Sequence, residues 1–135
     1  MTTKTPVHSE KLPTKMFSRG LKVSNYSELF LVSGYGDLGP GYQVRHPGDP
    51  VAQTRYIFAD VKSFLEQAGY SINDVIRVEL TFTKDVERTK YDDIFELVTE
   101  FFADVEVKPA TGTLRIVDEL AMPGMLVEYE FLAAK

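Results

Sequence analysis

The sequence predicts an α+β fold in which one mixed β-sheet is covered on one face by two helices. Two segments show apolar residues at the three- and four-residue spacing of a helix, and five are rich in β-branched and aromatic residues. Their order is strands, helix, strand, helix, strands, which is typical of an α+β layer structure. The 135 residues are 44% hydrophobic, enough for one core. We expect a flexible N-terminal segment, residues 1–15, followed by a single domain, residues 16–135.

Two strands are expected before the first helix, over residues 20–24 and 29–34. A glycine-rich run follows at residues 34–41. It does not fit a phosphate-binding loop, because it lacks a Lys-Ser/Thr ending and opens no recognisable helix. It is either a plain glycine turn or a loop that borders a cleft, in which case Tyr35 offers a ring or hydroxyl to a ligand.

The first predicted helix begins at Asp49-Pro50, because Asp caps free N–H groups and Pro suits the first helical position. It ends at Gly69. The second helix has the clearest helical period in the chain. Its apolar stripe faces away from a row of acids and consists of Tyr91, Ile94, Phe95, Val98, Phe101 and Phe102. We interpret both helical stripes as core packing rather than as ligand walls.

Three further strands are expected over residues 75–83, 112–117 and 125–132. Residues 76–82 and 126–131 alternate apolar and polar side chains, so each strand should turn one face to the helices and one face elsewhere. The uncovered face carries Arg77, Glu79 and Thr81, and it needs either solvent or a partner subunit. The pattern therefore favours a homo-oligomer with clefts at the subunit boundaries.

Composition excludes several classes of function. The chain has no cysteine, and only His8, His46 and carboxylates remain as metal ligands, so we expect no metal and no cofactor. The net charge of −5 and scattered basic residues oppose nucleic-acid binding. The first fifteen residues have no apolar run long enough for a signal peptide or a membrane span, which favours a cytoplasmic protein that does not bind membranes.

Several short segments, in order and with matching gaps, resemble the YjgF/RidA family, also known as the L-PSP endoribonuclease family. They are Phe17-Ser18-Arg19-Gly20, Leu29-Phe30-Leu31-Val32-Ser33-Gly34, Ala52-Gln53-Thr54-Arg55, Leu65-Glu66-Gln67-Ala68-Gly69, Asp74-Val75-Ile76-Arg77-Val78, Phe101-Phe102, Pro109-Ala110 and Val127-Glu128-Tyr129-Glu130. No single segment is specific, but the ordered set covers nearly the whole chain. The resemblance implies a chorismate-mutase-like fold assembled as a homotrimer, with small-molecule clefts between subunits.

The resemblance also implies a chemistry, which is the hydrolysis of enamines and imines to a keto acid and ammonia. Glu128 matches the family's catalytic Glu, and Glu130 on the same strand face is an alternative one register step away. Ser33 and Gly34 match the Ser-Gly lining of the cleft. Phe17 stands where many relatives have Tyr, so the ring is kept and the hydroxyl is lost.

One expected residue is missing. In characterised relatives an Arg directly after Pro-Ala grips the substrate carboxylate, whereas this chain has Thr111 there. Threonine is uncharged and cannot form the forked contact. If residues 110–117 were a regular strand, Thr111, Thr113 and Arg115 would share a face, and Arg115 would stand about 13 Å further along. Arg115 then either compensates for the missing Arg or pairs with an acid on the sheet surface.

Three functions remain open. In the first, the chain is a deaminase for an enamine or imine other than the usual 2-imino acids, and Glu128 handles protons. The residues that line its cleft are Phe17, Ser33, Tyr35, Thr111 and Thr113. Alternatively, it is a non-catalytic trimer that binds a metabolite or a protein, which Thr111 favours. Endoribonuclease activity is the third reading, and the acidic balance disfavours it.

Overall fold

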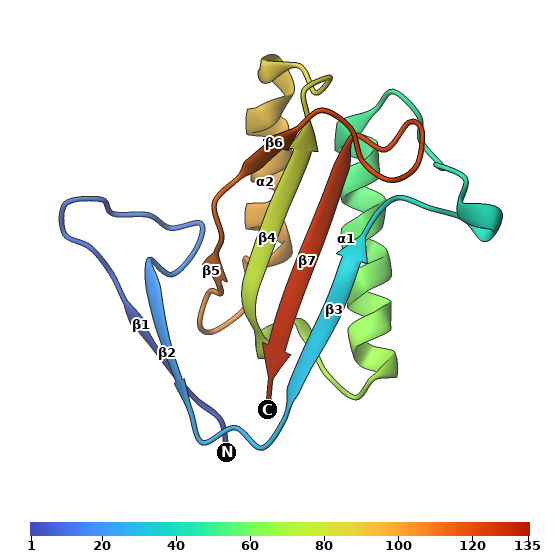
Figure 1. The fold of residues 1–135 in the computed structure, drawn as a ribbon. Coiled ribbons are helices and arrows are strands. Elements are labelled where there is room, and N and C mark those ends of the chain that lie inside the picture. The colour runs from blue at the N-terminus through green and yellow to red at the C-terminus, as the bar shows by residue number, and fades with distance from the viewer.

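A computed structural model describes all residues, 1–135. Figure 1 shows a central sheet with two helices behind it and a separate hairpin at one side. The strands are β1 (Thr3–Val7), β2 (Gly20–Ser24), β3 (Leu29–Tyr35), β4 (Val75–Thr83), β5 (Ala110–Thr111), β6 (Arg115–Val117) and β7 (Val127–Ala134). The helices are α1 (Pro50–Gln67) and α2 (Tyr91–Phe101), with 3₁₀ turns at Pro40–Tyr42, Ile72–Asp74 and Arg88–Lys90. No helix is long and apolar enough to cross a membrane.

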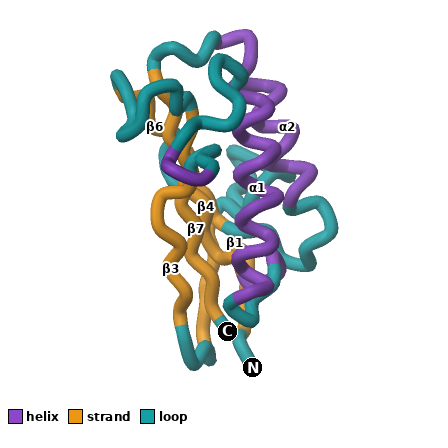
Figure 2. The backbone as a smooth tube through the Cα atoms, turned by 90° about the vertical axis from the view of Figure 1, so that its right-hand side faces the viewer, coloured by secondary structure: helices purple, strands orange, loops and turns teal.

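The predicted α+β layers are confirmed. Strands β3, β7, β4 and β5 lie side by side in that order, and β6 also pairs with β4. β4 runs antiparallel to β7 and parallel to β5 and β6, so the sheet is mixed. Both helices lie on one side of the sheet, as the side view in Figure 2 shows. We call the opposite, helix-free side the outer face.

Both helices form where the sequence predicted them. The Asp49 carboxylate accepts a hydrogen bond from the Ala52 N–H at 3.0 Å, which caps the start of α1, and Pro50 occupies the first helical turn. α2 buries Tyr91, Ile94 and Val98 against the sheet. The buried residues of both apolar stripes are therefore core, while Phe95 and Phe101 of the second stripe are only half-buried.

The core is closed by the inner faces of β4 and β7. Phe82, Val127 and Tyr129 are completely buried. The Tyr129 hydroxyl lies 2.6 Å from the Thr54 hydroxyl, which itself donates to the Pro50 carbonyl. Because the Thr54 proton is used in that bond, Tyr129 is the donor to Thr54. A buried hydrogen bond thus ties β7 to the first turn of α1.

Two features of the fold differ from the prediction. The segment 1–15, for which no element was predicted, contains β1, which pairs with β2 in a two-stranded sheet of its own. The predicted strand 112–117 is interrupted. Val78 pairs with Thr111, and Thr81 pairs with Arg115. The chain therefore advances four residues from β5 to β6 while β4 advances three. The extra residue breaks the regular alternation, as in a β-bulge.

We expect Tyr129→Phe to destabilise the protein by about 0.5–1.5 kcal/mol, because it deletes the donor of a buried hydrogen bond and keeps the ring. Chemical denaturation at neutral pH measures the change. Tyr91→Phe is the matched control, since the buried Tyr91 ring packs on Phe82 and its hydroxyl makes no hydrogen bond. An equal loss of stability in both variants would contradict the role of the Thr54–Tyr129 bond.

Candidate functional site

A β-bulge places Ser33 and Gly34 beside Glu128. Val32 pairs with Phe131 and Tyr35 with Tyr129, so two residues of β3 oppose the single Glu130 of β7. Ser33 and Gly34 are both exposed. A Cβ atom on Gly34 would clash with the Oε1 atom of Glu128. Glycine at position 34 therefore leaves the space that the Glu128 carboxylate occupies.

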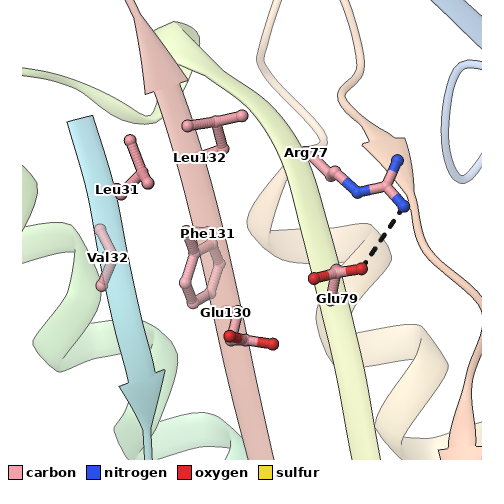
Figure 3. A pocket seen from close by; sticks show the side chains of 7 residues that line it. All are labelled: Leu31, Val32, Arg77, Glu79, Glu130, Phe131 and Leu132. Carbon is pink, nitrogen blue, oxygen red and sulfur yellow. Dashed lines mark hydrogen bonds and ion pairs between the residues drawn. The ribbon is translucent and has the colours of Figure 1, made fainter. Parts of the chain in front are cut away.

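The outer face carries a second set of charges, shown in part in Figure 3. Glu79 lies 3.4 Å from the Arg77 guanidinium and 3.3 Å from that of Arg115. Arg115 also lies 3.8 Å from the Glu130 carboxylate. Arg115 is thus paired with acids on the sheet surface, and it does not share the position of Thr111. The interrupted strand explains the difference, because Arg115 pairs with Thr81 on the outer face while Thr111 pairs with Val78 on the inner face.

Glu128 differs from the other acids of this face. It is half-buried, and no cation lies within ion-pair distance of it, whereas Glu79 and Glu130 both contact arginines. Burial raises the pKa of Glu128, and the nearby negative charge of Glu130 raises it further. A carboxylic acid with a raised pKa is suited to giving up a proton near neutral pH. These contrasts favour Glu128 over Glu130 as a functional acid.

Phe17, Thr111 and Thr113 come together in a different place. They line a cavity of about 310 Å³ at the β5 edge of the sheet, on the side of α2, which we call the edge cavity. Its lining residues are Met16, Phe17, Arg19, Leu80, Phe95, Val98, Thr111, Gly112, Thr113 and Leu114. Most of these side chains are apolar, and Arg19 is the one charged residue among them.

Long-range hydrogen bonds hold the two walls of the edge cavity against each other. The Ser18 N–H donates to the Pro109 carbonyl at 2.9 Å, and the Ser18 hydroxyl donates to the Lys108 carbonyl at 2.6 Å. The Lys108 ammonium in turn donates to the carbonyls of Phe102 and Ala103 at the end of α2, at 2.6 and 2.9 Å. The loop before β2 is thereby fixed beside Thr111.

Tyr35 lies apart from both groups. It pairs with Tyr129 on the inner face of the sheet, and its ring centroid is 6.2 Å from that of Phe64 on α1. Burial raises the pKa of the Tyr35 hydroxyl, and the charge of Asp60 adds to the effect. The residues named from the sequence therefore lie in three places. The outer face carries Glu128, Ser33, Gly34 and Arg115. The edge cavity is lined by Phe17, Thr111 and Thr113, and Tyr35 lies under α1.

Strand order separates the first two places within one chain. Ser33 and Gly34 are on β3 and Thr111 is on β5, with β7 and β4 between them. Three strand spacings amount to about 14 Å. No hydrogen bond or ion pair joins Glu128 to the edge cavity. No group of three His, Asp or Glu side chains is arranged to hold a metal ion.

Sequence reasoning missed one residue, Arg19. It belongs to the Phe17-Ser18-Arg19-Gly20 segment, whose sequence indicates no role for Arg19 itself. Its position in the cavity depends on the long-range contact between the loop before β2 and residues 108–109. Nothing in the local spacing of residues indicates that contact.

We expect Glu128→Gln to be more stable than the parent protein at neutral pH. The pKa of Glu128 is raised in the folded state, so the folded state binds more protons than the unfolded state between the ordinary value of 4.5 and the folded value. Stability contributed by this group is therefore lost as the pH rises through that range. Below pH 4.5 the advantage of the variant should vanish.

Denaturation midpoints of parent and variant over a pH series measure this effect. Glu119→Gln is the control, since Glu119 is exposed on a loop and makes no ion pair. A Glu128→Gln protein that is less stable than the parent at pH 7, or equally offset at every pH, would contradict the assigned environment of Glu128.

Comparison with known proteins places the chain in a family. Residues 9–135 match the family model described as endoribonuclease L-PSP. A RutC family protein of Pyrococcus horikoshii is 32% identical over 125 residues, which cover 91% of this chain and 90% of the relative. A RutC family protein of Aquifex aeolicus is 31% identical over 126 residues, covering 92% of each chain.

Solved structures agree with this fold. YyfB of Yersinia pestis, a Rid family protein of unknown function, superposes with a TM-score of 0.85 at 20% identity, covering 98% of both chains. A member of the YjgF/YER057c/UK114 family from Mycobacterium tuberculosis superposes with a TM-score of 0.63 at 25% identity, covering 98% of this chain and all of the other. On the family match and the sequence relatives together, the chain belongs to the YjgF/RidA family, the family of the endoribonuclease L-PSP model.

Proposed function

We propose that this protein is a trimeric deaminase that hydrolyses an enamine or imine other than the usual 2-imino acids, with Glu128 as the residue that handles protons. The observation that carries the proposal is the environment of Glu128. It is the half-buried acid of the outer face that lacks a cation, its pKa is raised, and Gly34 makes room for its carboxylate. An acid in such surroundings is a functional-site candidate on physical grounds.

The proposed reaction needs one group that can both accept and donate a proton. Water adds to the imine carbon while one of its protons passes to the nitrogen, which gives a carbinolamine. The remaining hydroxyl then becomes the carbonyl oxygen: its proton also passes to the nitrogen, the C–N bond breaks, and ammonia leaves. Ionised Glu128 accepts the proton from water, and protonated Glu128 gives it to the leaving nitrogen. A raised pKa suits one carboxyl group to both steps. The exposed hydroxyl of Ser33 is available to hold the substrate beside it.

A complete site requires a second copy of the chain in this proposal. Glu128 with Ser33, and Phe17 with Thr111, lie at separate places in one subunit. The outer face also leaves Leu29 and Leu31 exposed, at 45% and 72% of their surface, on the strand that carries Ser33. An uncovered sheet face with exposed leucines supports burial against another subunit. Pairing the outer face of one subunit with the edge cavity of the next would give three equal clefts in a homotrimer.

The alternative function is a non-catalytic trimer that binds a metabolite or a protein. The observation that favours it is Thr111, because a neutral hydroxyl replaces the carboxylate-binding Arg that the family's usual chemistry uses. In that case Glu128 would be a solvated strand residue with no part in turnover.

We expect the parent protein to accelerate the release of keto acid from bulky imines, which an amino acid oxidase generates from phenylalanine and other large apolar amino acids, and to leave the usual small 2-imino acids almost unhydrolysed. Glu128→Gln should lower the rate by about 10²-fold or more, since it removes the general acid and base. Thr111→Arg should shift preference towards small imines, because it restores the missing clamp. Keto acid release, followed continuously, measures all three proteins.

Glu130→Gln is the matched control for this experiment, because Glu130 is the neighbouring acid on the same face of β7. It should retain turnover within a few-fold, and the rising limb of its pH profile should move to lower pH, since the charge of Glu130 helps to raise the pKa of Glu128. A parent protein that is inactive on every imine, while Thr111→Arg gains activity, would support the non-catalytic alternative instead.

A further inference from the structure

The edge cavity contains a cation that stands in no ion pair. Arg19 is exposed at the cavity lining, and no carboxylate lies within ion-pair distance of its guanidinium. By contrast, Arg115 is occupied by Glu79 and Glu130, and Arg77 by Glu79. Arg45 contacts Asp37 and Asp60. Arg19 is therefore a positive charge beside an apolar cavity with its hydrogen-bond donors unused by the protein.

The backbone around Arg19 is held in place. Ser18, its neighbour, is 99% buried and makes two hydrogen bonds to residues 108 and 109, immediately before Thr111. The position of Arg19 relative to Thr111 is thus fixed by long-range contacts, although the end of the side chain reaches solvent. Because the backbone of Arg19 is already fixed, less conformational entropy is lost when its side chain binds an anion.

The other lining residues indicate the chemical character of the rest of the ligand. Thr111 and Thr113 offer hydroxyl groups, while Phe17, Leu80, Phe95 and Leu114 offer apolar surface. Arg19 is exposed, whereas Leu80 and Val98 are buried, so the charged residue lies on the solvent side of the apolar lining. The volume of about 310 Å³ is within the range of small-molecule sites.

We propose that Arg19 binds the carboxylate of a small acid whose apolar or aromatic part fills the edge cavity, and so takes over from the arginine that Thr111 replaces. The proposal deepens the proposed function, because it names the substrate class for the same site. Guanidinium binds carboxylate through paired hydrogen bonds, which an uncharged residue cannot reproduce. Holding the carboxylate at the mouth instead of at residue 111 leaves the interior for a bulky group, and this selects against the smallest imino acids.

Calorimetric titration with phenylglyoxylate, a stable 2-oxo acid with an aromatic group, tests this assignment without any turnover. The parent protein should bind the acid at least about tenfold more tightly than its uncharged methyl ester. Arg19→Gln should lose that preference and about tenfold or more in affinity for the acid. Arg19→Lys should retain part of both. Arg55→Gln is the matched control, since Arg55 is an exposed arginine beside a different groove, between α1 and α2, and its loss should change nothing.

The assignment is overturned if the parent binds acid and ester equally, or if Arg19→Gln binds the acid as well as the parent. The outcomes also separate this assignment from the proposed function. Keto acid release with an unchanged KM in Arg19→Gln would leave the hydrolase standing and remove Arg19 from the site. Binding of the acid that depends on Arg19, without imine hydrolysis, would support the role of Arg19 and contradict the proposed hydrolase.

Discussion

The alternation of side chains along β4 and β7 is the constraint on which the rest of the structure depends. One face of each strand is buried under α1 and α2, where Phe82, Val127 and Tyr129 lose all contact with water. The other face carries acids and arginines and has no helix to cover it. Because alternation has a period of two, a shift of one residue in either strand would exchange these faces, so the register of the sheet also decides where Glu128 points.

The same register produces a charged surface in which most acids are neutralised and one is not. Arg115 reaches Glu79 and Glu130 across the sheet, and Arg77 adds a second contact to Glu79. Glu128 lies two residues before Glu130 on the same face of β7. It makes none of these contacts and lies against the bulge that contains Gly34. The raised pKa of Glu128 thus follows from its burial beside this bulge and from the nearby charge of Glu130.

The separation of Glu128 from the edge cavity explains why the proposed site needs more than one subunit. A small ligand cannot span about three strand spacings within one sheet and still touch Ser33 and Thr111. In the proposed trimer, a second copy would pack its outer face near the edge cavity and bring Glu128 of one subunit beside Thr111 and the proposed anion-binding Arg19 of the next. Thr111, which stands where the resemblance leads us to expect an arginine, and Arg19, which makes no ion pair, would then line one side of the same proposed cleft.

Much of the fold follows from sequence patterns, and much of the site does not. Helical periodicity and the Asp49-Pro50 start predicted both helices, and alternation predicted the two faces of β4 and β7. β1 was missed because its stability depends on backbone pairing with β2 rather than on an apolar pattern of its own. The break between β5 and β6 was missed because one extra residue against β4 is invisible without the partner strand. Arg19 was missed for the same kind of reason, since only a tertiary contact brings it to Thr111.

Site-directed cross-linking tests the shared cleft most directly, because the chain has no cysteine and only introduced thiols react. Ser33 and Thr113 are both exposed, one on the outer face beside Glu128 and one at the edge cavity. A Ser33→Cys/Thr113→Cys protein treated with a short bis-maleimide should run as a covalently linked trimer on a denaturing gel, while either single variant should remain monomeric. A double variant that is linked only within its own chain, or not linked at all, would contradict a site shared between subunits.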